Sequence, residues 1–206
     1  MASTELYLWT TPNGYKPLLL LEELGTPYEA RPIHIGKGEQ HTPAFLEINP
    51  NGKIPALVDR LDDGRTIKIF ESGAILVYLA EKSGKFLPAG GQERADVLSW
   101  LMFQMGGVGP MLGQYGHFKR LKPEVEYGLE RYGAEVKRLL GVLEGRLSQH
   151  PFLAGEYSIA DMATYPWIRG AESFYQMDLS PYPALQRWLG AIGERPATQR
   201  AYAWTP

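Results

Sequence analysis

The glycine- and proline-containing segment at residues 83–91 constrains the fold most, because strand signals stop there. Before it, β-rich runs alternate with helical patterns. After it the patterns are helical, and apolar residues from Leu129 to Leu147 recur at three- and four-residue steps. A chain of 206 residues accommodates one large domain or two small ones. We therefore expect a mixed α/β domain at residues 1–82, a linker at 83–91 and an all-helical domain at 92–206.

The first part of the chain predicts a specific order of elements. Alternation of polar and apolar residues, turn chemistry at Gly and Pro, and a helix stop at Gly25 indicate where each element begins and ends. The expected elements are strands at 5–9, 28–35, 56–59 and 66–70, and helices at 15–24, 43–48 and 71–80. This order, βαβαββα, is that of a thioredoxin-like domain.

Glu71, Ser72 and Gly73 lie where the last of these strands gives way to a helix. The first turn of a helix presents backbone N–H groups without helical partners, and these groups bind anions. The hydroxyl of Ser72 adds a donor beside them, and the carboxylate of Glu71 is suited to an ammonium group. An anion site next to a cation site fits the α-amino-acid end of a small zwitterion.

The segment from Asn51 to Leu57 contains Pro55, which has no N–H and whose preceding peptide bond is able to adopt the cis form. Such a segment suits the edge of a sheet. There the backbone N–H and C=O of Ile54 are left for an extended peptide ligand.

The composition limits the chemistry. The chain has no cysteine, so disulfides, a thiol nucleophile and thiolate zinc sites are excluded, and the four histidines lack ligand spacing, so no metal site is expected. A net charge of −2 gives no basic field for nucleic acid. The longest aliphatic run, Leu18–Leu21, is too short to cross a membrane, and residues 1–5 do not resemble a secretion signal, so we expect a cytoplasmic protein.

Together, the Ile54–Pro55 and Glu71–Ser72 segments resemble the glutathione site of the glutathione transferase family, and the resemblance spans essentially the whole chain. In that family the residue before a cis-proline pairs with the cysteinyl backbone of glutathione, and the acid–serine pair holds its γ-glutamyl end. The resemblance implies a thioredoxin-like domain followed by an all-helical one, a homodimer, and glutathione as substrate with no permanently bound cofactor.

The junction between the first strand and the first helix holds the thiolate-stabilising groups in this family. Here it contains Thr11, Pro12, Asn13 and Gly14, which resemble the bacterial Nu-type transferases. By that match Thr11 and Asn13 donate to the glutathione sulfur. The alternative is that either residue only caps the helix, since both types are preferred there; Tyr15 is a weaker candidate for the same role.

Three further residues match glutathione contacts of the Nu type or lie next to one. Gln40 follows a loop like the Nu-type loop whose glutamine contacts glutathione, and Arg131 lies on the long helical stripe where the matching arginine reaches the ligand. Lys53 precedes Ile54 and is a candidate to meet a carboxylate of glutathione. The alternatives are a solvated glutamine, a solvated lysine, and an arginine paired along its helix with Glu135. Further along, Ser158 and Asp161 form a predicted capping box that supports folding rather than catalysis.

The resulting expectation is a glutathione-dependent disulfide-bond oxidoreductase. Because the chain has no sulfur nucleophile, a bound glutathione thiolate must attack a small disulfide, and a second glutathione must complete the reduction. Reduction of organic hydroperoxides and weak conjugation to electrophiles are adjacent activities. The alternative is a non-catalytic glutathione transferase-like binding or regulatory module.

Overall fold

The computed structural model describes residues 3–121, 123 and 125–206, and the chain divides into two compact units. The first unit comprises residues up to Lys85 together with Arg195–Pro206, and the second comprises Phe86–Glu194. The first unit is therefore formed from two separate parts of the sequence. This grouping differs from the expected boundaries, which assigned all of residues 92–206 to the helical domain.

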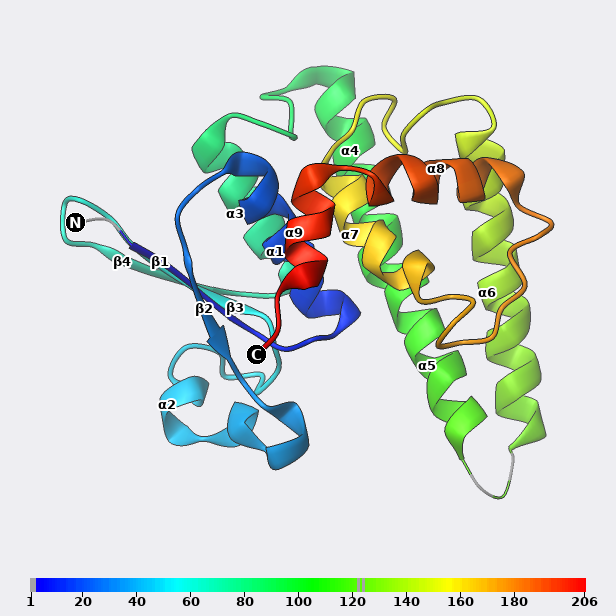
Figure 1. Ribbon diagram of the computed structural model, residues 1–206, viewed down its shortest axis with the longest axis horizontal. Helices are drawn as coiled ribbons and strands as arrows, with labels where there is room; N and C mark the ends of the chain where they lie inside the picture. Colours follow the sequence, from blue (N-terminus) through cyan, green and yellow to red (C-terminus); the bar gives the residue numbers. More distant parts are fainter. Residues whose placement is uncertain (1–2, 122, 124) are drawn as a thin grey trace. The chain divides into compact units, whose positions relative to one another are not determined.

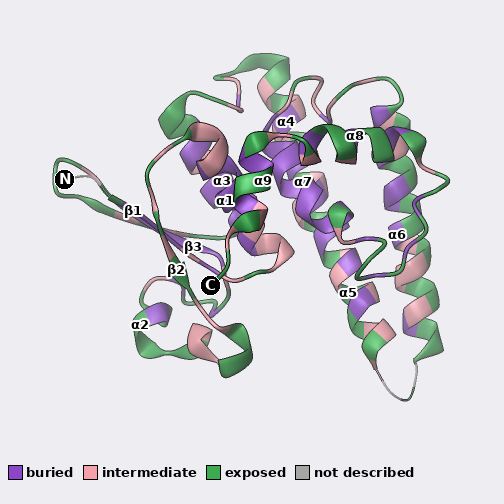
Figure 2. Ribbon diagram, in the orientation of Figure 1, coloured by how far each residue is buried: buried purple, intermediate pink, exposed green. Residues whose placement is uncertain are grey.

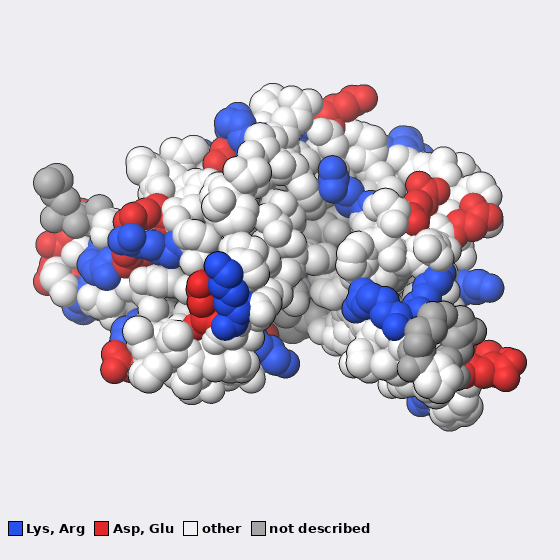
Figure 3. All heavy atoms as spheres, turned by 60° about the horizontal axis from the view of Figure 1, so that its bottom comes forward, with Lys and Arg blue, Asp and Glu red and all other residues white. Residues whose placement is uncertain are grey.

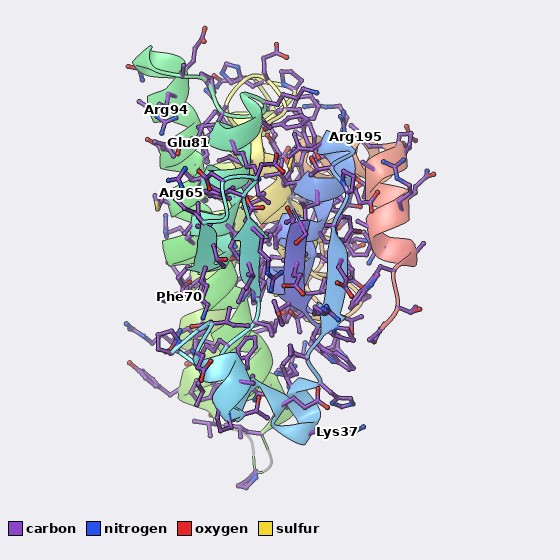
Figure 4. The ribbon with its side chains drawn as sticks, turned by 90° about the vertical axis from the view of Figure 1, so that its left-hand side faces the viewer. Lys37, Arg65, Phe70, Glu81, Arg94 and Arg195 are labelled. Atoms are coloured by element: carbon purple, nitrogen blue, oxygen red, sulfur yellow. The ribbon has the colours of Figure 1, made fainter. Side chains whose placement is uncertain are left out.

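A four-stranded sheet forms the centre of the first unit, and Figures 1 and 4 show its strands side by side. The strands are β1 (Ser3–Leu8), β2 (Glu29–Pro32), β3 (Ala56–Arg60) and β4 (Thr66–Phe70). Their order is β2-β1-β3-β4, with β1 parallel to β2 and antiparallel to β3, and with β3 antiparallel to β4. Leu6 and Leu57 are register partners on the two central strands, and both are fully buried. The sheet is therefore mixed, with β4 at one edge.

Helices pack around this sheet. They are α1 (Pro12–Leu24), α2 (Pro43–Leu46), α3 (Ser72–Ser83) and α9 (Pro196–Ala203), with short 3-10 turns η1 (Ile35–Lys37) and η2 (Glu39–His41) between β2 and α2. Helix α1 packs against both α3 and α9, and its residues Leu18–Leu21 are fully buried. Among the residues that the structure describes, no helix has the length and apolar content needed to cross a bilayer.

The last helix joins the first unit through specific contacts with α1. Arg195, labelled in Figure 4, pairs with Glu23 at 2.5 Å, and the ring of Tyr202 stacks on that of Tyr15 with centroids 4.3 Å apart. The sequence pattern at residues 195–206 indicates a helix but not its partner. The grouping of residues 195–206 with the first unit therefore has a physical cause in these long-range contacts.

The second unit is helical, and α7 lies at its centre. Its helices are α4 (Gly91–Phe103), a single π-helical turn η3 (Gln104–Val108), α5 (Gly109–Arg120), α6 (Glu126–Leu147), α7 (Ile159–Arg169) and α8 (Pro183–Gly193). Figure 2 shows α7 as buried, and its residues from Ile159 to Ile168 are all buried. Helices α5 and α6 lie side by side as a hairpin (Figure 1).

The element order βαβαββα and the helical second part confirm the predicted fold class. Most element boundaries differ from prediction by one to three residues, and two of the larger differences lie close to the site. Helix α1 begins at Pro12 rather than Tyr15, because Thr11 caps it, and β2 ends at Pro32 rather than at residue 35, where η1 has already begun. On the face in Figure 3, acidic and basic side chains lie in small groups with uncharged surface between them.

Candidate functional site

Thr11 is the N-cap of α1, in extended conformation with φ −129° and ψ 158°. Its Oγ1 accepts a hydrogen bond from the backbone N–H of Gly14 at 3.2 Å. The capping role is therefore present. Since the hydroxyl acts as acceptor in this bond, its own hydrogen is not used there and is directed elsewhere. Asn13, half-buried in the first turn of the same helix, supplies an amide at the same end.

Gly14 allows the backbone to close tightly at this junction. A Cβ atom built on Gly14 would lie 2.2 Å from the carbonyl oxygen of Trp9, a backbone atom that has little freedom to move. Only a residue without a side chain fits, so Gly14 determines how closely the start of α1 approaches the end of β1.

We expect Gly14→Ala to destabilise the protein by about 1 to 3 kcal/mol, as overpacking typically does, and to lower any activity that depends on Thr11. Urea unfolding and turnover measure the two effects. Gly141→Ala is the matched control, because a Cβ there meets nothing within 4 Å and the helix gains propensity. A Gly14→Ala protein with wild-type stability would contradict the close approach.

Ile54 precedes a cis peptide bond to Pro55, as the sequence suggested, and β3 begins only at Ala56. Across the described part of the chain, no backbone hydrogen bond is found to the N–H or C=O of Ile54. The loop before it is held by the Asn49 amide, which donates to the carbonyl of Lys53 at 2.5 Å. This leaves the Ile54 backbone free to pair with an extended ligand, as predicted; Lys53 is exposed.

Glu71 and Ser72 lie at the start of α3, directly after Phe70 at the end of edge strand β4 (Figure 4). Glu71 has φ 71°, a left-handed conformation that is uncommon for a residue with a side chain. Strained backbone of this kind is concentrated at functional sites. Ser72 is the first residue of α3 and is only 3% exposed, whereas Glu71 is exposed. The predicted helix start is confirmed.

Hydrogen bonds join these three segments of the first unit. The amide of Asn51, in the loop before Ile54, donates to the carboxylate of Glu71 at 3.4 Å. The ammonium of Lys16 on α1 donates to Oγ of Ser72, also at 3.4 Å. The start of α1, the loop before β3 and the start of α3 are thus brought together as the sequence analysis expected.

Lys16 is the residue that the sequence analysis missed. It is 1% exposed, and burial lowers the pKa of its ammonium to about 7, while the nearby Glu71 carboxylate acts in the opposite direction. A signal was present in the sequence, because Lys16 precedes Leu19 and Leu20 by three and four residues and so shares their apolar helix face. A lysine on such a face is either buried or extends out of it.

Gln40 lies in η2 and is half-buried. Its Nε2 is 3.2 Å from Nε2 of His41. Its Oε1 is buried and has no hydrogen-bond partner among the described residues. A buried acceptor of this kind is costly unless a ligand satisfies it, which favours the binding role over that of a solvated glutamine.

Arg131 lies on α6 of the second unit, exposed, beside a cavity of about 580 Å³. The cavity is lined by Met111, Arg131, Tyr132, Ala134, Glu135 and Arg138. Glu135 makes a two-pronged pair with Arg138 at 2.7 and 2.8 Å, and this pair holds the pKa of the Glu135 carboxyl below its usual value. Glu135 therefore pairs directly with Arg138, while Arg131 acts on the same carboxylate electrostatically. A glutathione contact by Arg131 stays a prediction.

The fold and this arrangement define the class of protein. The family model described as "Glutathione S-transferase, N-terminal domain" matches residues 2–81, and the model "Glutathione S-transferase, C-terminal domain" matches residues 126–191. The chain belongs to the glutathione transferase family.

Individual relatives cover nearly the whole chain. Disulfide-bond oxidoreductase YfcG of Escherichia coli is 49% identical over 96% of this chain and 93% of its own length, and YghU of the same organism is 45% identical over 95% and 73%. A glutathione transferase family member from Pseudomonas fluorescens, solved with two glutathione bound, superposes with a TM-score of 0.93 at 44% identity over 97% and 92%. A Pseudomonas putida glutathione transferase, solved with one glutathione disulfide bound per subunit, has a TM-score of 0.89 at 42% identity over 97% and 90%.

Proposed function

We propose that this protein is a glutathione-dependent disulfide-bond oxidoreductase in which Thr11 and Asn13 stabilise the glutathione thiolate. The observation that carries the proposal is the Thr11 hydroxyl at the N-cap of α1. It accepts from Gly14 and keeps its hydrogen for a further acceptor. The name of the E. coli relative at 49% identity supports the same chemistry.

The first unit offers complementary groups for each part of glutathione. The carboxylate of the γ-glutamyl end is suited to Ser72 and the first turn of α3, and its amine to Glu71. The cysteinyl backbone is suited to Ile54, whose own backbone groups make no bond to the described residues. Gln40, through its buried Oε1, and the exposed Lys53 are proposed as further contacts.

The reaction proceeds by two thiol–disulfide exchanges. A bound glutathione thiolate attacks one sulfur of a disulfide, forming a mixed disulfide and releasing the other half as a thiolate that takes up a proton. A second glutathione thiolate attacks the glutathione sulfur of the mixed disulfide. This releases the second substrate thiol and forms glutathione disulfide. Two electrons pass from two glutathione molecules to one disulfide, and no sulfur of the protein takes part, since the chain has no cysteine.

The thiol of free glutathione has a pKa near the usual cysteine value of about 8.5, so stabilising its thiolate raises the reactive fraction at neutral pH. Hydrogen bonds to a charged group contribute about 1.5 to 3 kcal/mol each. One such bond is enough to lower the thiol pKa by about one to two units. The start of α1 adds the positive end of the helix dipole to this effect.

The test is glutathione-dependent reduction of a small dialkyl disulfide, followed as NADPH consumption through added glutathione reductase. We expect a rate well above the reaction of free glutathione with the same disulfide. If the protein binds glutathione in calorimetry but does not exceed the uncatalysed rate, the non-catalytic binding module is the correct interpretation. If it does neither, the proposed site itself is wrong.

Further properties belong to the same proposal. The Nu class, a homodimer, and a contact from Arg131 to glutathione rest on the family resemblance. Reduction of organic hydroperoxides follows from the same thiolate attacking oxygen instead of sulfur, and weak conjugation from its attack on carbon. A cytoplasmic location fits the need for a reduced glutathione pool.

A further inference from the structure

Lys16 is a charged residue in the interior of the first unit that the proposed chemistry does not yet use. It lies in the second turn of α1, is 1% exposed, and donates to Oγ of Ser72 at 3.4 Å. Burying an ammonium group is costly unless something in the structure or a ligand compensates for it. Ser72 opens α3, whose first N–H groups already favour an anion. A buried cation added at this position makes the start of α3 strongly attractive to a carboxylate.

The direction of the hydrogen bond shows how Lys16 acts. A charged ammonium group has donors only, so Oγ of Ser72 must be the acceptor in this contact. The hydrogen of the Ser72 hydroxyl is therefore directed away from Lys16. Lys16 thus both orients the hydroxyl as a donor and adds positive charge behind it.

Resting on the proposed function, we propose that Lys16 is a positioning residue for the γ-glutamyl carboxylate of glutathione, acting through the hydroxyl of Ser72. Glu71 holds the ammonium group of the ligand next to this carboxylate. The γ-glutamyl end is thus held by three residues, Glu71, Ser72 and Lys16, rather than by the acid–serine pair alone. An uncharged residue of similar size at position 16 would leave Ser72 in place but remove its orientation and the charge.

The charged groups near Lys16 come from several elements of the first unit. Glu71 of α3 bears on it electrostatically. Glu22 and Glu23 lie at the far end of α1 and are paired with arginines of the α9 segment. Glu5 of β1 is paired with arginines of β2 and β3. A bound carboxylate at the start of α3 would add negative charge near Lys16 and raise the pKa of its ammonium from about 7.

Calorimetric binding of S-methylglutathione tests the proposal without thiol chemistry. We expect Lys16→Met to weaken binding by about 10- to 100-fold, the range for a hydrogen bond to a charged group. The decisive ligand is the γ-aminobutyryl analogue of S-methylglutathione, which lacks only the γ-glutamyl α-carboxylate. For this analogue Lys16→Met should change the affinity by less than about 2-fold.

Two comparisons separate positioning from a structural role. In a Ser72→Ala background, Lys16→Met should cost less than about 3-fold, because Lys16 acts through the hydroxyl. The matched control is Lys85→Met, an exposed lysine beyond the other end of α3, which should leave both affinities unchanged. Equal weakening for both ligands, or no weakening for either, overturns the proposal.

The wild-type protein provides a second measurement that does not depend on a variant folding. At pH 8, S-methylglutathione binding measured in buffers of different ionisation enthalpy should show net proton uptake from the buffer, because the bound carboxylate favours the protonated form of Lys16. The γ-aminobutyryl analogue should show much less, and equal uptake for both contradicts the proposal. Carboxylate-dependent binding without turnover would support the role of Lys16 and overturn the disulfide reductase function. Turnover combined with no effect of Lys16→Met on binding would support the disulfide reductase function and overturn the role of Lys16.

Discussion

Thr11→Asp is expected to lower kcat/KM for glutathione-dependent disulfide reduction by about 10- to 150-fold while the protein stays as stable as wild type. Asp keeps an acceptor for the Gly14 N–H, so the helix cap is retained, but it has no hydroxyl to donate to a thiolate. The loss includes one hydrogen bond to a charged group, about 1.5 to 3 kcal/mol, and the Asp carboxylate adds repulsion of the thiolate to it. Coupled NADPH consumption measures the rate, and urea unfolding measures the stability.

Companion variants distinguish catalysis from capping. Thr11→Ser retains donor and acceptor and should keep most of the activity, and Asn13→Ala should lose activity by a comparable factor. In Thr11→Asp and in Asn13→Ala the pH–rate profile should move to higher pH, since the thiol pKa of bound glutathione rises. Thr10, the exposed residue before Thr11, provides the control: Thr10→Ala should leave the pH–rate profile unchanged. Full activity in Thr11→Asp would show that Thr11 only caps the helix.

Asp161→Ala is expected to reduce the free energy of unfolding by about 3 to 5 kcal/mol, the largest stability effect that we predict. The Asp161 carboxylate is fully buried and accepts from the backbone N–H groups of Leu153 and Ser158, from the Ser158 hydroxyl and from the indole of Trp188. Burial raises the pKa of this carboxyl to about 6 despite these donors. Alanine would leave the donors buried without partners.

Urea unfolding at pH 7.5 measures this effect, with Asp178→Ala as the control. Asp178 also accepts from a nearby backbone N–H, that of Ser180, but it is exposed, so its removal should cost less than about 1 kcal/mol. Ser158→Ala should fall between the two, at about 1 kcal/mol, because it removes the cap but leaves the acid in place. A small effect of Asp161→Ala would mean that water reaches the site and replaces the carboxylate.

The residues that could be predicted from the sequence are those whose effect is local. The helix start at Ser72 and the capping box of Ser158 and Asp161 depend on neighbouring residues, and both are confirmed. The cis bond at Pro55, which the family resemblance implied, is present as well. The alternation of strands and helices likewise gave the order of the elements. The resemblance to a family then identified which of these local features belong to one site.

The features that were missed depend on contacts distant in sequence. Lys16 meets Ser72 across 56 positions, and Arg195 meets Glu23 across 172. A helical pattern shows which face of a helix is apolar, but not which element covers it. A lysine on the buried face was for this reason not recognised as part of the site.

The assignment of Arg195–Pro206 to the first unit also has a consequence for synthesis of the chain. In the order of the sequence, the second unit is an insertion into the first. Helix α9 packs against α1, so α1 lacks this contact until α9 has been synthesised. On the ribosome, the helical unit is able to assemble as soon as its own residues have emerged. The glutathione-binding unit, although its sequence comes first, is completed last, when residues 195–206 have been translated.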